Sequence, residues 1–432
     1  MHPEMSNLDW FEYLKTYGSK PGLHPIQQLL KQLEDPQNKF RSIHVTGTNG
    51  KGSTTAITAS ILQAAGYKTG MFTSPHLSNV NESIQINRKS IPTKSMNTIL
   101  GNIREQIEIM LSQGERHSTE FEVLVALAFT YFAKERVDVA VIEVGMGGRD
   151  DATNVIDSMA SIVTNISLEH TQWLGDTEEK IAQIKAGILK KDTELVTAVT
   201  QPNIKALLQD IAAKNQSRFT HIGTDIIITP ETSSLEAQTF TVKTPTQKLT
   251  HLSTPLLGSH QRRNAACAIA AIEAAQRKGF KIPREAIYKG LAEVNWSGRF
   301  EVVEREPLII LDGAKDAQAI KALVETVKDY LPNRKITSIV GISSDKNHQS
   351  MIQSLAEITE RFILTEHRVQ NRTSRALELE RIAEKTGIPV ESITPVEKAI
   401  QYAKQRARPD DVIIITGSVF LIGEAREHWY RS

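Results

Sequence analysis

The 432-residue sequence predicts an α/β protein in which helices cover parallel β-sheets. Apolar runs that end in turn residues alternate with segments of helical period, and the runs lack strict polar alternation, which is typical of strands buried on both faces. The length favours two or three domains, because globular domains usually contain about 100 to 200 residues. A second α/β series places a domain boundary near residues 295 to 300.

The composition is that of an ordinary globular protein. Basic and acidic residues nearly cancel, 51 against 50, so no overall field attracts nucleic acid or an anionic membrane. The N-terminal residues lack a signal-peptide pattern, and no segment approaches 18 uninterrupted apolar residues, which together predict a cytoplasmic protein. The single cysteine, Cys267, lies in an alanine-rich helical run and is expected to be buried and structural.

The first α/β series can be followed element by element. The strand FRSIHVT precedes a helix expected over 53–65, and TGMFTS supplies the next strand. Thr119 and Glu122 have capping-box spacing before an almost wholly apolar helix, which predicts a core helix. The runs VDVAVIEVG and ASIVTNIS then predict two further strands, the second ending at Ile166.

The sequence pattern changes twice in the rest of the chain, first to an antiparallel type and then to a second α/β series. Alternating stretches over residues 215–256 predict a peripheral antiparallel patch on the first domain. A helical run follows from Gln261 to about Arg277. The runs LIILDGA, KITSIVGI, RFILTE and DDVIIITGS then alternate with helical patterns, which predicts a second, smaller parallel sheet.

The segment HVTGTNGKGST is expected to bind phosphate. It departs from the usual P-loop spacing, because Val45 stands at the first glycine position and Gly52 separates Lys51 from Ser53. Glycines still allow backbone N–H groups and a helix N-terminus to face an anion, and a lysine can neutralise its charge. The glycines are Gly47, Gly50 and Gly52, and the lysine is Lys51. The hydroxyls of Ser53 and Thr54 can reach phosphate or Mg²⁺. A plain strand-to-helix turn also needs glycines, but the lysine inside it favours ATP.

Two downstream segments place acidic and histidine side chains after strands. Glu143 ends the apolar run VDVAVIE, and ligands in open α/β sheets bind at the carboxyl ends of strands. This position therefore predicts that the Glu143 carboxylate is a Mg²⁺ ligand. Glu169, His170 and Lys185 follow the next strand. A lone histidine is more often structural than metal-binding, so spacing alone does not assign His170.

Eight motifs occur in the order typical of one family. They are HVTGTNGKGST, FTSPHL, FEVLVALAFTYF, EVGMGGRDDATN, LGDTEEKIAQIKAGILK, LGSHQRRNAACAI, SGRFEVV and TGSVFLIGEAR. With them the chain resembles the folylpolyglutamate synthase and dihydrofolate synthase family, a branch of the Mur ligase superfamily. The resemblance covers nearly the whole chain.

The resemblance implies a fold and an activity. It implies a P-loop-type doubly wound parallel sheet over residues 1–296 and a smaller Rossmann-like glutamate-ligase domain over residues 297–432, with the active site between them. Family members use MgATP to phosphorylate a carboxylate of a folate or of dihydropteroate, and the amine of L-glutamate then displaces the phosphate. The family also suggests a monomer.

Individual positions match the family's functional residues. ATP-binding residues by this resemblance are Asn49, Gly50, Lys51, Gly52, Ser53, Thr54, Asn264, Arg299 and Asp312. The ligands of two Mg²⁺ ions would be Ser74, Glu143, His170 and Lys185, the last as a carbamylated lysine. The catalytic set would be Lys51, His170, Lys185 and Arg299.

The chain departs from the family pattern at several positions. Glu169 replaces an aspartate, Ile184 replaces a glutamate, and DGAKDA replaces DGAHNP, so that Lys315 stands at the histidine position. The arginine usual before Glu82 is absent as well. Three functions are therefore compatible with the sequence: a ligase adding glutamate to folates and also to dihydropteroate, a diverged ligase for another carboxylate, or a nucleotide-binding regulatory protein.

Overall fold

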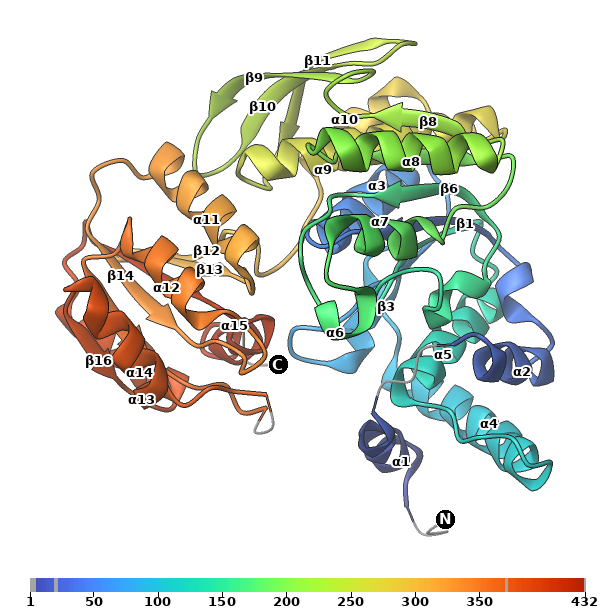
Figure 1. The fold of residues 1–432 in the computed structure, drawn as a ribbon, viewed down its shortest axis with the longest axis horizontal. Helices are drawn as coiled ribbons and strands as arrows, with labels where there is room; N and C mark the ends of the chain where they lie inside the picture. The colour runs from blue at the N-terminus through green and yellow to red at the C-terminus, as the bar shows by residue number, and fades with distance from the viewer. Residues whose placement is uncertain (1–4, 19–21, 370–371, 431–432) are drawn as a thin grey trace.

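The computed structural model describes residues 5–18, 22–369 and 372–430. The chain forms two α/β lobes, with the N-terminal lobe and the orange-to-red C-terminal lobe lying side by side (Figure 1). No helix in the described part of the chain combines the length and the apolar composition that crossing a membrane requires.

An eight-stranded sheet forms the centre of the first lobe. Its strand order is β4-β3-β2-β5-β1-β6-β7-β8, and all neighbouring pairs are parallel except those that β3 and β4 make. The strands are β1 (Arg41–Thr46), β2 (Thr69–Phe72), β3 (Ile84–Ile86), β4 (Lys89–Ser90), β5 (Val139–Glu143), β6 (Ser158–Val163), β7 (Glu194–Thr197) and β8 (Arg218–His221). The central strand β5 is buried along its whole length, as its apolar sequence predicts.

Helices cover both faces of this sheet. One face packs against α3 (Lys51–Ala64), α9 (Ser259–Arg277) and α10 (Arg284–Ala292). The other carries α1 (Asn7–Tyr13), α2 (His24–Gln32), α4 (Thr93–Ser112), α5 (Glu120–Lys134), α7 (Glu178–Ala186) and α8 (Pro202–Lys214). A short helix, α6 (Thr171–Leu174), precedes α7. An antiparallel sheet of β9 (Ile227–Ser233), β10 (Gln238–Lys243) and β11 (Lys248–Thr254) lies at the edge of the lobe (Figure 1).

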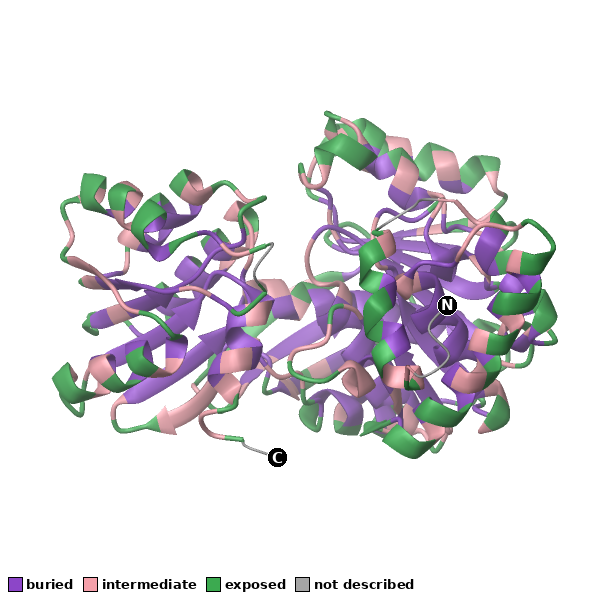
Figure 2. Cartoon of the chain, turned by 90° about the horizontal axis from the view of Figure 1, so that it is seen from below, coloured by how far each residue is buried: buried purple, intermediate pink, exposed green. Residues whose placement is uncertain are grey.

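The second lobe contains a six-stranded sheet in the order β12-β13-β17-β14-β15-β16, with only β12 antiparallel. The strands are β12 (Glu301–Arg305), β13 (Leu308–Asp312), β14 (Ile336–Val340), β15 (Arg361–Leu364), β16 (Val390–Ser392) and β17 (Val412–Thr416). Its helices are α11 (Ala317–Tyr330), α12 (His348–Ala356), α13 (Ala376–Ala383), α14 (Val396–Arg406) and α15 (Val419–Arg426). In both lobes most of the central strands are buried, whereas the outer helix faces are exposed (Figure 2).

Most predicted elements are confirmed. Thr119 caps α5 and Glu122 completes the capping box. Cys267 is fully buried in α9, and burial raises the pKa of its thiol to about 12, so it is not a nucleophile at neutral pH. The second series of strands forms the predicted parallel sheet.

Three predicted details are wrong. The helix after β1 begins at Lys51 rather than Ser53, because Gly50 has a φ of 82° and turns the chain into the helix at once. β6 ends at Val163 rather than Ile166, because Thr164 and Asn165 leave the strand to bind Asn49. The region 215–256 is not wholly antiparallel, since β8 pairs in parallel with β7.

Candidate active site

The glycine-rich loop lies between β1 and α3, at the carboxyl edge of the large sheet. Gly47 has a φ of 143°, and a Cβ there would lie 1.8 Å from the Thr164 Oγ1 atom. Gly50 lies against Asn264, whose Oδ1 atom would be 2.4 Å from a Cβ. Both positions therefore require glycine. The resulting turn leaves the N-terminus of α3 exposed to a ligand at its positive end.

Two lysines meet on the carbonyl oxygen of Gly47. Lys51 Nζ donates to Gly47 O at 3.1 Å and to Thr48 O at 3.2 Å. Lys185 Nζ, from α7, donates to Gly47 O at 2.9 Å. Lys185 is 1% exposed, and burial together with the charge of Lys51 lowers its pKa to about 7. The loop thus gathers positive charge from two distant segments around one backbone turn.

Glu143 lies at the end of β5, beside the segment that contains Ser74. Its Oε2 atom accepts a hydrogen bond from the Ser74 backbone N–H at 3.3 Å. Burial raises the pKa of Glu143, and the charges of Lys51, Lys315 and Arg299 act in the opposite direction. A carboxylate buried in this way needs a cation to remain ionised.

Glu169 and His170 form a second polar pair near the loop. His170 Nε2 lies 3.2 Å from Glu169 Oε1. Burial alone would raise the pKa of Glu169, but the hydrogen bond to His170 and the charges of Lys51, Lys185 and Lys315 outweigh it and lower the pKa. The buried Oε2 atom of Glu169 has no hydrogen-bond partner in the described part of the chain.

The remaining predicted contacts come from α9 and from the junction of the two lobes. Asn264 Nδ2 donates to Gln261 Oε1 at 3.0 Å, and the side chain packs on Gly50. Arg299 donates to Gly298 O at 2.9 Å, and its charge acts on Glu143. The side chain of Asp312 fixes nearby backbone, since its carboxylate accepts hydrogen bonds from the N–H groups of Phe300 and Ala314, each at 2.9 Å.

Residues of the second lobe also reach this loop, through contacts that the sequence did not predict. Asn49 Nδ2 donates to Asp316 Oδ1 at 3.2 Å and to Gln318 Oε1 at 3.4 Å, and Asn165 Nδ2 donates to Gln318 Oε1 at 3.0 Å. The charge of Lys315 acts on Lys185, Glu143 and Glu169. No local signal pairs these segments, which lie more than a hundred residues apart in the sequence.

The side chains present fit a magnesium site only in combination with other donors. Across residues 5–18, 22–369 and 372–430, no three His, Cys, Asp or Glu side chains gather into a metal-holding group. Glu143 has a buried carboxylate and Glu169 has an unpartnered oxygen, which are hard oxygen donors of the kind Mg²⁺ prefers. A magnesium ion here would need further oxygens, such as a hydroxyl, a phosphate or a modified lysine.

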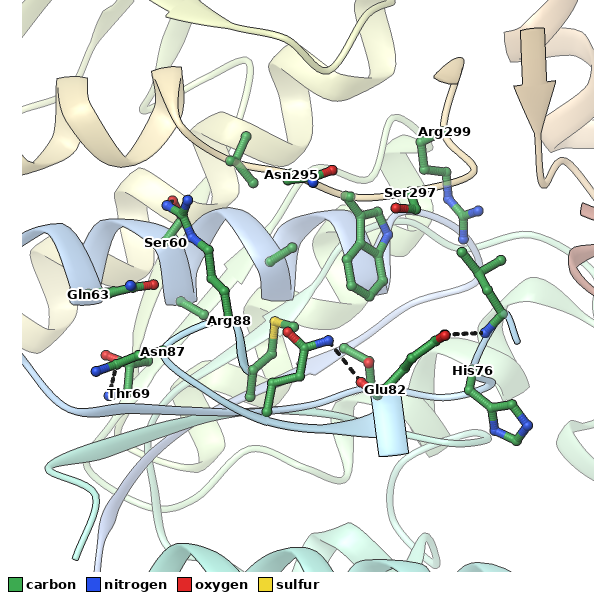
Figure 3. Close-up of a pocket in the computed structure, with 18 of the residues that line it drawn as sticks. Ser60, Gln63, Thr69, His76, Glu82, Asn87, Arg88, Asn295, Ser297 and Arg299 are labelled. Carbon is green, nitrogen blue, oxygen red and sulfur yellow. Dashed lines mark hydrogen bonds between the residues drawn. The ribbon is translucent and has the colours of Figure 1, made fainter. Parts of the chain in front are cut away.

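A cavity of about 390 Å³ extends from this site along one side of α3. Figure 3 shows Arg299 and His76 at one end and Gln63, Asn87 and Arg88 at the other. Met71, Val294 and Trp296 supply apolar wall. Apolar walls combined with a few fixed polar groups are typical of small-molecule sites.

Comparisons with known proteins agree with this geometry. Residues 45–272 match the Mur ligase middle domain and residues 298–419 match the Mur ligase, glutamate ligase domain. The dihydrofolate synthase/folylpolyglutamate synthase of Bacillus subtilis is 34% identical, and the alignment covers 97% of each chain. The folylpolyglutamate synthase structure from Thermotoga maritima is 33% identical with a TM-score of 0.86, covering 98% of this chain and 96% of that one.

A third relative was solved with nucleotide. The folylpolyglutamate synthase of Mycobacterium tuberculosis, complexed with ADP and AMPPCP, is 29% identical with a TM-score of 0.91, and the alignment covers 99% of each chain. All three alignments cover at least 96% of each chain, so they span both lobes. The chain belongs to the dihydrofolate synthase/folylpolyglutamate synthase family of Mur ligases, enzymes that form an amide bond at the expense of ATP.

Proposed function

We propose that this protein ligates L-glutamate to a reduced folate, and that it also accepts dihydropteroate. The observation that supports this most directly is the gathering of Lys51, Lys185, Glu143 and Glu169 around one phosphate-type loop between two lobes. The comparisons give no support to a diverged ligase for another carboxylate or to a regulatory protein. We also propose a cytoplasmic monomer, with its domain boundary between residues 296 and 297.

The proposed reaction has two steps. A substrate carboxylate oxygen attacks the γ-phosphorus of ATP and ADP leaves, which forms an acyl phosphate. The glutamate amine then attacks the acyl carbon, inorganic phosphate leaves and the nitrogen loses a proton, which forms the amide. The first step converts the carboxylate oxygen, a poor leaving group, into a phosphate, a good one. Water must be excluded from the acyl phosphate between the steps.

The residues have separate roles in this proposal. The loop N–H groups of 49–54 hold the β- and γ-phosphates, and Lys51 turns from Gly47 O to the transferred phosphoryl group. Arg299 and Asn264 bind the nucleotide from outside the loop, and Asp312 orders the turn that faces it. Mg²⁺, when bound, neutralises phosphate charge, and Ser74, Glu143, His170 and carbamylated Lys185 would hold up to two ions.

A direct assay tests the function. The purified protein receives ATP, Mg²⁺, bicarbonate and L-glutamate, with tetrahydrofolate or dihydropteroate in parallel reactions. We expect ADP release that depends on glutamate, with a product heavier than the substrate by one or more glutamyl units. The absence of a mass gain with both substrates would contradict the proposal.

The cavity beside α3 leads to a prediction about substrate affinity. We propose that it receives the folate, because its carboxamides can match the donor and acceptor edges of a pterin while Trp296 and Met71 contact the ring. Ala59, on α3, lines the cavity. Ala59→Leu should raise the KM for the folate by about tenfold and leave the KM for ATP unchanged, since the added methyl groups occupy ligand space. Initial rates at varied folate concentration measure this.

A matched variant separates occlusion of the cavity from damage to the fold. Ala213 is exposed on α8, so Ala213→Leu makes the same chemical change outside the cavity. It should leave both KM values at the wild-type level. An unchanged folate KM in Ala59→Leu, at a wild-type unfolding temperature, would show that the folate binds elsewhere.

A further inference from the structure

The turn that contains Lys315 is fixed at both ends. On one side, Asp312 Oδ1 accepts from the Ala314 N–H at 2.9 Å. On the other, Asp316 is the N-cap of α11 and accepts from the Ala319 N–H at 2.9 Å. The backbone of Lys315 therefore has little freedom, and only its side chain can adjust.

Contacts between the lobes hold this turn against the phosphate-type loop. Asp316 and Gln318, on the second lobe, both accept from the Nδ2 atom of Asn49, which belongs to the loop itself. Asn165 adds a bond to Gln318 from the first lobe, at 3.0 Å. These bonds place the residue next to Asp316 at the edge of the proposed phosphate site.

The ammonium group of Lys315 has no partner of its own. Among the described residues it makes no hydrogen bond and no ion pair within 4.0 Å, although the charges of Lys51, Lys346, Glu169 and Asp316 act on it. Burial and the neighbouring Lys51 lower its pKa. Lys315 is partly buried, and a partly buried cation without a counter-ion is costly. It is the arrangement expected where an anionic ligand completes the site.

We propose that Lys315 is a catalytic residue that the second lobe contributes to the γ-phosphoryl group of ATP and to the acyl phosphate formed from it. Lysine suits this role, because its flexible stem carries a compact charge with three donors. Lys51 approaches the phosphates from the first lobe and Lys315 from the second, so both lysines can engage only when the lobes are together. The proposal rests on the proposed ligase function, and it gives the DGAKDA departure from the family pattern a chemical role.

Nucleotide binding tests this without requiring ligase turnover. Calorimetric titration with ADP and with the β,γ-methylene analogue of ATP compares ligands that differ in the γ-phosphate. Lys315→Gln should weaken binding of the ATP analogue by about tenfold and change ADP binding by less than about twofold, because only the analogue has the group that Lys315 contacts. Lys315→Arg retains the charge and should recover most of the analogue's affinity.

Lys321 provides the matched control, since it is exposed and lies on α11 beyond the turn. Lys321→Gln should bind both nucleotides as the wild type does. Equal affinities of wild type and Lys315→Gln for the analogue, or an equal loss for both nucleotides in Lys315→Gln, would overturn the proposal. A protein that binds nucleotides as expected here but forms no glutamyl product would instead contradict the proposed function.

Discussion

Lys51→Gln is expected to lower kcat for amide formation by roughly 100- to 1000-fold, the usual cost of removing one donor aimed at developing charge. Lys51 Nζ rests on two carbonyl oxygens of its own loop, Gly47 O and Thr48 O. Neutral carbonyl groups hold an ammonium weakly compared with phosphate oxygens. The lysine is therefore held in place for an incoming phosphate. Glutamine is one atom shorter and keeps a polar end group without the charge.

ADP release and product mass, measured under saturating substrates, give the change in kcat. The control is Lys94→Gln, because Lys94 is exposed on α4, on the face of the sheet opposite α3. It should retain wild-type kcat. A loss of less than about tenfold in Lys51→Gln would mean that the backbone N–H groups alone stabilise the transferred phosphoryl group.

The elements near the site were predictable from local sequence. β5 is a continuous apolar run, so burial on both faces follows from its composition. The cap of α5 follows from the spacing of Thr119 and Glu122, which are neighbours on the first helical turn. The loop 47–52 was predictable because glycines and a lysine between a strand and a helix are typical of a phosphate-binding loop.

The errors arise where tertiary contacts override local preference. Thr164 and Asn165 read as part of a strand, but their side chains bind Asn49 in the glycine-rich loop. Their backbones bond to Thr46 and Thr48 without extending the strand. The strand β8 read as part of an antiparallel patch, yet it adds to the edge of the large sheet beside β7. Neither outcome has a signal within a short window of sequence.

The site itself was only partly predictable. Position along strands and the family motifs predict the place of Lys51 and Glu143, which end or follow neighbouring strands. The meeting of Lys185 with Gly47, and of Asp316 with Asn49, joins segments 138 and 267 residues apart. Such pairs depend on how helices and lobes pack, so a change such as Lys315 could be noted in the sequence but not interpreted.

Substitution of Lys185 is expected to have the second large effect on kcat. Burial first, and then the charge of Lys51, lower its pKa to about 7. At neutral pH a large share of such amines is therefore neutral, whereas ordinary lysines are almost wholly protonated. A neutral amine nitrogen can attack the carbon of CO₂ and lose a proton, which yields a carbamate. The product is an anion with two oxygens beside Lys51 and Lys315, where it removes a like charge and can serve as a metal ligand.

Lys185→Gln should therefore lower kcat by roughly 100- to 1000-fold, because it removes the charge that the carbamate contributes near the transferred phosphoryl group. Wild-type protein in ¹³C-bicarbonate should give a carbamate resonance that the variant lacks. Its intensity should fall as pH drops below about 7, since protonation of the amine competes with carbamylation.

Lys180→Gln is the control for this experiment, since Lys180 is exposed on the same helix, α7, and its ammonium group pairs with Asp176. It should retain both the resonance and the activity. An equal resonance in wild type and Lys185→Gln would place the carbamate elsewhere. Loss of activity in Lys185→Gln, with no resonance in the wild type at any pH, would mean that Lys185 acts as an amine. In that case its bond to Gly47 O, which shapes the phosphate loop, would be its contribution.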